Sequence, residues 1–243
     1  MIMLGIFAIV WLVAGLAVCL SRPRHPNNVY ILTKMLGKAQ WILGIKVRCK
    51  DFPEARALMP AILVGNHQTN WDIILLANLL QPGVVCVGKK SVIFAPIFGI
   101  LFFLSGNILI DRNNHSKTGS QFVEIVRKIK KKSLSIWMFP EGHRSGGKGM
   151  LQFKSGAVHT AMLAKVPIIP FVASSYVDQI KLNRWNNGEI ILEMLPPVSF
   201  KDAQRGDLKT INKELRQNMI NKIKELDKVA VRPIGTKLPT YDD

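Results

Sequence analysis

The most informative part of the chain reads AILVGNHQTNWD and covers residues 61–72. The apolar run at residues 61–64 predicts a short buried strand, and the polar residues after it predict a turn into a helix. His67 and Asp72 stand five positions apart, which is about 140° around a regular helix, so they do not share a helical face. If His67 lies in the turn and Asp72 in the first helical turn, the carboxylate can accept a hydrogen bond from one imidazole nitrogen. The other nitrogen then remains available to take a proton from a hydroxyl group.

This pair alone is not specific, because Asp72 is equally explained as a helix cap that accepts backbone N–H groups. Three further blocks follow, each beside an apolar run: GNILIDR at residues 106–112, FPEGHRS at residues 139–145 and VPIIP at residues 166–170. Arg112 and Arg144 each follow a predicted strand, where open α/β sheets usually place ligand contacts. A guanidinium can donate two parallel hydrogen bonds to a phosphate. Taken singly, each arginine is also explained as a solvated charge at a strand end.

The rest of the chain alternates between strand and helix patterns, which predicts helices packed on a sheet. Strands are predicted at residues 61–65, 84–87, 107–111, 134–139, 167–173 and 189–194, and helices at residues 70–80, 116–131, 155–164 and 207–229. The prolines around residues 166–170 predict a pocket wall or a sheet edge, with core packing as the equal alternative.

The N-terminal segment predicts contact with a membrane. Residues 1–20 contain no charged side chain and would extend roughly 30 Å as a helix, the thickness of a bilayer core. Arg22 and Arg24 follow directly, which favours a cytoplasmic position for the rest of the chain, and the absence of a charged n-region disfavours a cleaved signal peptide. We expect a retained anchor. The alternative is a helix half sunk in one leaflet, with residues 30–47 as a second, amphipathic helix.

A second uncharged run covers residues 92–110 but is interrupted by Pro96, Gly99 and Gly106. It therefore predicts a short apolar helix followed by a buried strand, and not a membrane span. These patterns divide the chain into an N-terminal membrane anchor with a helical pair at residues 1–50, a catalytic domain at residues 51–230 and an extended or disordered tail at residues 231–243.

The composition narrows the class of partner. The chain has 243 residues, a hydrophobic fraction of 48% and a net charge of +17, which fits one domain with a substantial core and an anionic partner. The basic residues are spread along the chain, with no zinc-finger spacing or aromatic RNA-binding motif, so we do not expect a nucleic acid. The three cysteines show no C-x-x-C spacing and predict neither a metal site nor a disulfide framework.

Together the four blocks resemble the NHxxxxD, GxxxIxR, FPEGTRS and VPxxP motifs of the glycerolipid acyltransferases, and the similarity extends over residues 1–230. One difference is visible, because His143 stands where the family usually has Thr. The resemblance implies an α/β fold with a mixed sheet flanked by helices and an N-terminal membrane-anchoring segment. It also implies His67 as the general base and Asp72 as its orienting partner. The implied substrate-binding residues are Arg112, Glu141, Gly142, Arg144 and Lys154.

The activity implied is transfer of a fatty acyl chain from a coenzyme A or acyl-carrier-protein thioester to the sn-2 hydroxyl of 1-acyl-glycerol-3-phosphate, the lysophosphatidic acid, which yields phosphatidate. A thioester is already activated, and the chain has no G-x-S-x-G motif, so direct attack by the acceptor hydroxyl is expected, with no metal or redox cofactor. The expected location is the bacterial inner (cytoplasmic) membrane, on an anionic surface, with the catalytic domain on the cytoplasmic side. The alternatives are acylation of another lysophospholipid or an amino-lipid, and a non-catalytic lipid-binding protein.

Overall fold

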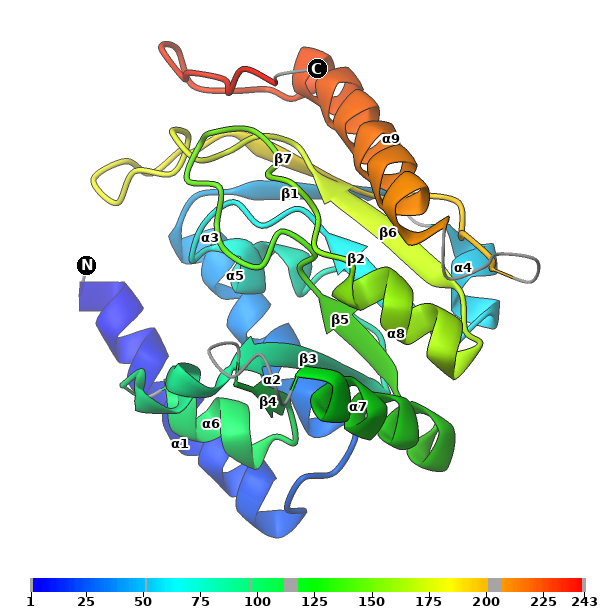
Figure 1. The fold of residues 1–243 in the computed structure, drawn as a ribbon. Coiled ribbons are helices and arrows are strands. Elements are labelled where there is room, and N and C mark those ends of the chain that lie inside the picture. The colour runs from blue at the N-terminus through cyan, green and yellow to red at the C-terminus, as the bar shows by residue number, and fades with distance from the viewer. Residues whose placement is uncertain (1, 51, 97, 112–117, 201–206, 242–243) are drawn as a thin grey trace.

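The computed structural model describes residues 2–50, 52–96, 98–111, 118–200 and 207–241. Within these residues seven strands form one sheet in the order β1-β7-β6-β2-β5-β3-β4, and helices cover both of its faces (Figure 1). The strands are β1 Lys46–Lys50, β2 Ile62–Gly65, β3 Val84–Lys89, β4 Ile108–Ile110, β5 Ser135–Met138, β6 Ile168–Ala173 and β7 Glu189–Met194.

The sheet is mixed, as expected from the family resemblance. β2 pairs in parallel with both β5 and β6, and β3 pairs in parallel with β5 and β4. β6 and β7 are antiparallel, and β1 adds to β7 in parallel. The carboxyl ends of β2, β5, β3 and β4 therefore meet at one edge of the sheet. The residues that follow these strands are brought together there, although they are far apart in the sequence.

Helices α7 (Thr118–Lys132), α8 (Gly156–Ala164) and α9 (Leu208–Val229) cover one face of the sheet, and α2 (Asn28–Gly37), α3 (Ala39–Ile42) and α5 (Asp72–Leu76) cover the other (Figure 1). The short helix α4 (Pro53–Ala57) precedes β2. β2, β5 and β6 are buried along their whole length because helices lie on both sides of them.

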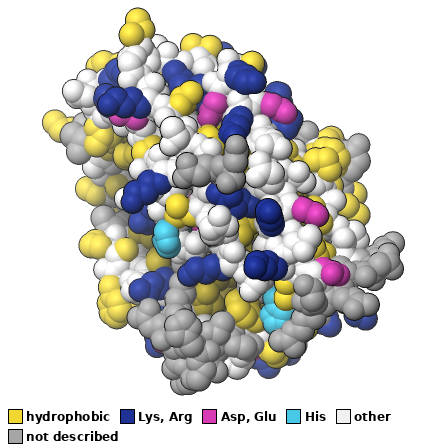
Figure 2. Space-filling view, turned by 45° about the horizontal axis from the view of Figure 1, so that its top comes forward, with side chains coloured by type: hydrophobic (Ala, Val, Ile, Leu, Met, Phe, Trp, Pro, Cys, Tyr) yellow, Lys and Arg dark blue, Asp and Glu magenta, His cyan; other side chains and the backbone are white. Residues whose placement is uncertain are grey.

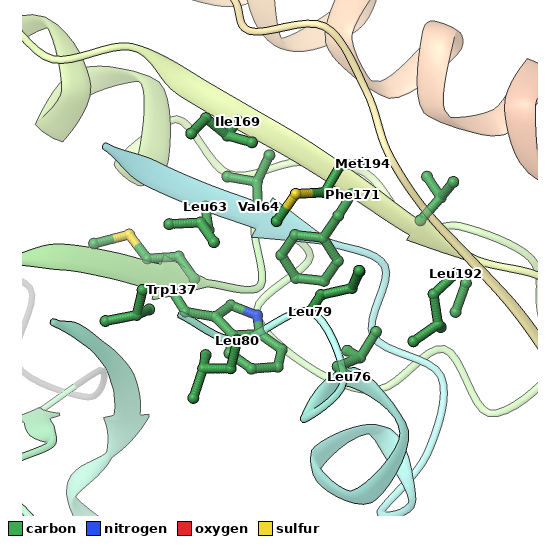
Figure 3. Packing of buried hydrophobic residues seen from close by; sticks show 14 of the residues in the cluster. Leu63, Val64, Leu76, Leu79, Leu80, Trp137, Ile169, Phe171, Leu192 and Met194 are labelled. Atoms are coloured by element: carbon green, nitrogen blue, oxygen red, sulfur yellow. The ribbon is translucent and has the colours of Figure 1, made fainter. Parts of the chain in front are cut away.

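Large side chains fill the space between the sheet and α5. The Trp137 ring meets the Phe171 ring edge to face, with centroids 5.2 Å apart. Figure 3 shows both rings beside Leu76, Leu79 and Leu80, which come from α5 and the residues after it. This packing fixes α5, and with it the position of Asp72, against the central strands.

Two expectations about local structure are wrong. The helix predicted at residues 70–80 ends at Leu76, and the Asn78 amide donates back to the carbonyl of Leu75 (2.8 Å). Such a side-chain contact competes with continued helical bonding. The helix considered for residues 30–47 is also broken, because the chain turns at Gly44 (φ +61°) and then enters β1, a strand that the sequence did not predict. β1 extends the sheet to residues before position 51.

The segment bracketed by prolines is in the core. β6 lies between β2 and β7, so the prediction of a sheet edge is wrong and the alternative of core packing is confirmed. Pro170 lacks an N–H, but its carbonyl accepts a hydrogen bond from the N–H of Leu195 (2.8 Å).

Helix α1 (Ile2–Ser21) has 20 residues and is long and apolar enough to cross a membrane. It packs beside α6 (Phe98–Leu104), and the Trp11 indole N–H donates to the carbonyl of Leu32 (2.9 Å). The opposite side of α1 is an exposed apolar face formed by Ile2, Met3, Ile6, Ile9, Val10, Val13 and Leu20.

The second uncharged run, at residues 92–110, contains the short helix α6 followed by β4, as predicted, and a 3₁₀ helix at Lys90–Phe94 precedes them.

Candidate active site

His67 and Asp72 meet as the sequence predicts. His67 lies in the turn between β2 and α5, Asp72 is the first residue of α5, and His67 Nδ1 is hydrogen-bonded to Asp72 Oδ2. The same carboxylate accepts the backbone N–H of Gln68 (2.9 Å) and of Thr69 (3.3 Å). Asp72 is therefore not a cap of α5, because the amides it accepts lie in the turn before the helix; it holds that turn together and fixes the orientation of the imidazole.

The imidazole of His67 is held by ring stacking as well as by its hydrogen bond to Asp72. The ring of Phe139, the first residue after β5, stacks on the ring of His67 with centroids 3.9 Å apart and an angle of 10°. The His67 side chain is 17% exposed, whereas Asp72 is 1% exposed. Burial raises the pKa of Asp72, and its hydrogen bond with His67 opposes that change. With Nδ1 bound to Asp72, the Nε2 atom is the one available to a substrate.

Glu141 is buried behind the histidine turn, with 2% of its surface exposed. Its Oε1 accepts the backbone N–H of His67 (2.6 Å), and its Oε2 accepts the backbone N–H of Leu151 (2.8 Å). Burial raises the pKa of Glu141 to about 7. Since both oxygens are already engaged, the side chain organises the site by tying the histidine turn to the loop that follows β5.

That loop holds three more of the predicted residues. The Ser145 N–H donates to the carbonyl of His67 (2.8 Å). Arg144, the residue before Ser145, therefore lies next to the histidine turn, and its side chain is exposed. Gly142 adopts φ +81°, and a Cβ at this position would lie 3.0 Å from Lys154 Cε. Gly142 and Lys154 are therefore neighbours. Arg112 lies outside the described residues.

A pocket of about 210 Å³ opens beside Phe139, between β3, β4, β5 and the start of α8. Its apolar walls are Val87, Ile110, Phe122, Met138, Phe139 and Ala157, and its polar groups are Asp111, Gln121 and Lys154. Because Phe139 both lines this pocket and stacks on His67, the pocket lies next to the candidate base.

Sequence reasoning assigned no role to two side chains that hold the histidine turn. The Asn66 amide donates to the carbonyl of Ala173 (3.0 Å) and accepts the N–H of the same residue (2.9 Å). The Gln68 amide donates to the carbonyl of Ser174 (3.0 Å) and accepts the N–H of Tyr176 (3.1 Å). Both residues belong to the quoted block, but their partners lie at the end of β6 and just after it, and are visible only in the fold.

Two other histidines, one in the loop after β5 and one on α8, have contacts of their own. His143, in the position where the resembling family has Thr, is exposed, and its Nδ1 is 3.4 Å from the carbonyl oxygen of Arg144. His159 on α8 meets the ring of Phe122 edge to face, with centroids 6.2 Å apart.

The fold places a His–Asp pair beside an apolar pocket, and comparison with known proteins identifies the class of enzyme. A family model described as "Acyltransferase" matches residues 45–174. The chain is 44% identical to the 1-acyl-sn-glycerol-3-phosphate acyltransferase of Salmonella typhimurium over 96% of both chains. It is 43% identical to the protein of that name from Escherichia coli K12, again over 96% of both chains. The chain therefore belongs to the acyltransferase family and is an acyltransferase.

More distant proteins share the same region. The alpha form of 1-acyl-sn-glycerol-3-phosphate acyltransferase from Homo sapiens is 31% identical, over 88% of this chain and 76% of that protein. The crystal structure of the 1-acyl-sn-glycerophosphate acyltransferase of Thermotoga maritima superposes with a TM-score of 0.66 at 21% identity, covering 83% of this chain and 80% of that chain. At this identity the likeness establishes a shared fold.

We predict that His67→Ala lowers kcat by about 10²- to 10⁴-fold, because a positioned general base is lost. Asp72→Asn should also be severe, because an amide favours the wrong imidazole tautomer. Turnover of an acyl thioester by the purified, folded variants measures both effects. His25→Ala, at an exposed histidine near the N-terminus, is the control and should keep the wild-type rate. Retention of most of the activity in both site variants would contradict the assignment.

Proposed function

We propose that the protein transfers a fatty acyl chain from an acyl thioester to the sn-2 hydroxyl of 1-acyl-sn-glycerol-3-phosphate and so makes phosphatidate. The observation that carries this proposal is the His67–Asp72 pair, held beside an apolar pocket and beside the loop that bears Arg144. The names of the relatives, which are 1-acyl-sn-glycerol-3-phosphate acyltransferases, support this acceptor. The donor is proposed to be acyl-CoA or acyl carrier protein, and no metal or redox cofactor takes part.

In the proposed reaction, Nε2 of His67 accepts the proton of the sn-2 hydroxyl as its oxygen attacks the thioester carbonyl carbon. Asp72 keeps Nδ1 protonated and stabilises the imidazolium that forms. The tetrahedral intermediate then breaks its carbon–sulfur bond. The thiolate leaves and takes the proton from His67, which restores the neutral base. No covalent acyl-enzyme is needed, because the thioester supplies the activation.

The surroundings of His67 suit the two substrates. The apolar walls beside Phe139 fit an acyl chain, because ligand pockets are mostly apolar with a few polar groups that set orientation. Arg144 and Lys154 are exposed cations on this side and can bind the glycerol phosphate. Arg112 is proposed for the same role. Glu141 supports the phosphate site indirectly, by holding the loop in which Gly142 adopts a positive φ.

Membrane attachment is proposed to occur through the exposed apolar face of α1, at the bacterial cytoplasmic membrane with the catalytic domain on the cytoplasmic side. The net charge of +17 would attract the chain to anionic lipid. Figure 2 shows one face of the molecule on which Lys and Arg side chains are much more frequent than Asp and Glu.

The experiment that tests the function is incubation of purified protein with a labelled acyl thioester and a panel of lyso-lipids, with product masses read by mass spectrometry. We expect acylation of 1-acyl-sn-glycerol-3-phosphate to exceed acylation of lysophosphatidylcholine, lysophosphatidylethanolamine and an amino-lipid. Preference for an acceptor without a terminal phosphate would contradict the proposed substrate. Binding without any thioester turnover would instead support a non-catalytic lipid-binding protein.

Arg144→Ala should raise the KM for the phosphorylated acceptor by about ten- to a hundredfold, because a charge-assisted contact is lost. Arg144→Lys should fall between Ala and wild type, since lysine restores the charge but not the two-pronged geometry. Steady-state kinetics with each substrate varied in turn measures this. Lys148→Ala removes an exposed charge from the same loop and serves as the control. A rise confined to the KM for the thioester would show that Arg144 contacts the donor.

Deletion of residues 1–21 should release the protein from membranes in high salt, because it removes the exposed apolar face of α1 and salt screens the remaining electrostatic attraction. Flotation with vesicles that contain anionic lipid, at low and high salt, measures the bound fraction. The full chain is the control and should stay bound in both conditions. Binding of the truncated chain at high salt would place the anchor elsewhere, with α6 as the first segment to test.

A further inference from the structure

Helix α9 reaches the candidate base through a continuous chain of hydrogen bonds. Arg216 on α9 donates from Nη2 to the carbonyl of Met150 (2.6 Å) and from Nε to the carbonyl of Leu151 (3.0 Å). The N–H of Leu151 donates to Glu141 Oε2 (2.8 Å), and Glu141 Oε1 accepts the N–H of His67 (2.6 Å). Arg216 is far from the motifs in sequence and lies outside residues 45–174, which the family model matches.

One peptide unit, between Met150 and Leu151, connects the hydrogen bonds of Arg216 to those of Glu141. The carbonyl of Met150 and the N–H of Leu151 belong to the same planar trans peptide, so they point in opposite directions. Arg216 holds the carbonyl on the α9 side, and this orients the N–H toward Glu141 on the other side. Met150 is 4% exposed, so water does not readily replace the guanidinium, and a rotated peptide would leave buried groups unpaired.

The C-terminal tail packs on the same part of the loop. The Tyr241 hydroxyl is 2.9 Å from Ser175 Oγ, and a Cβ added to Gly149 would lie 3.2 Å from Tyr241 Cδ1. Tyr241 and Glu141 line a common small cavity. The loop between Glu141 and Leu151 is therefore held from the α9 side by a guanidinium and by an aromatic ring, which leaves it little freedom to move away from the histidine turn.

We propose that Arg216 is a positioning residue for acyl transfer, which fixes the peptide between Met150 and Leu151 so that Glu141 holds the turn carrying His67. The proposal rests on the role of His67 in the proposed function. Arg216 touches neither substrate. Its effect reaches the reaction through Glu141, so it should act on the rate of the chemical step and not on the binding of the acyl thioester.

The first test uses Arg216→Gln, Arg216→Lys and the control Lys213→Gln, which removes an exposed charge one turn earlier on α9. Arg216→Gln should lower kcat by about ten- to a hundredfold, as expected for a misplaced reacting group, with little change in the KM for the thioester. Arg216→Lys should recover part of kcat, because lysine can donate to one carbonyl but lacks the fork. Wild-type kcat in Arg216→Gln, or an equal loss in the Lys213 control, would overturn the proposal.

The pH profile gives a readout that a purely structural role would not change. Ionised Glu141 accepts the two N–H groups more strongly than the neutral acid does, and its pKa is about 7 because burial and Asp72 raise it while the two backbone N–H groups and Arg216 lower it. Loss of the positive charge should therefore raise the pKa of Glu141. The acid limb of kcat against pH should move to higher pH in Arg216→Gln and stay in place in Lys213→Gln. An unchanged limb would contradict the proposed route through Glu141.

A double-mutant cycle separates this route from a general loss of stability. If Arg216 acts through Glu141, Arg216→Gln should cost much less in a Glu141→Gln background than in wild type. Multiplicative losses of kcat would overturn the proposal, as would a fall in Tm of the Arg216 variants without any loss of kcat in the folded protein. Failure of the proposed function is recognised separately, because the wild-type protein would then not acylate 1-acyl-sn-glycerol-3-phosphate.

Discussion

Glu141 is a buried carboxylate, and the arrangement of the site depends on the hydrogen bonds that compensate its burial. Burial of a charged group costs free energy unless hydrogen bonds compensate it. Glu141 meets this requirement with two backbone N–H groups, from His67 and Leu151, which belong to different loops. Asp72 meets it with the amides of its own turn and the imidazole. The contacts that make these charges tolerable are therefore the contacts that set the position of the base.

The parallel part of the sheet decides which residues share this site. β2 and β5 are neighbours, so the turn that carries His67 and the loop that begins at Phe139 leave the sheet at the same edge. The ring of Phe139 therefore has two contacts: it stacks on the imidazole of His67, and it forms part of the wall of the apolar pocket. An acyl chain in that pocket would bring its thioester close to the base. In the proposed reaction, this proximity and an activated donor would allow direct transfer without a protein nucleophile.

The N-terminal helix and the charge of the chain fit the chemistry of the proposed substrates. The proposed acceptor and product are both membrane lipids with an anionic phosphate. An exposed apolar face on α1 supplies attraction to hydrocarbon, and the net charge of +17 supplies attraction to an anionic surface. The first interaction depends little on salt and the second strongly, so ionic strength distinguishes them. A protein attached in the proposed way would meet its acceptor in the plane of the membrane and not in bulk water.

The sequence by itself determined what depends on neighbouring residues: the apolar first helix, most strands and helices of the domain, and the pairing of His67 with Asp72 across one turn. These features follow from local periodicity and spacing. Only the tertiary structure decided that α5 ends at Leu76, that residues 46–50 form an edge strand and that β6 lies in the core. It also decided the stacking of Phe139 and the reach of Arg216 to the loop. Each of these depends on a partner distant in sequence, and strand order and helix packing alone bring such partners together.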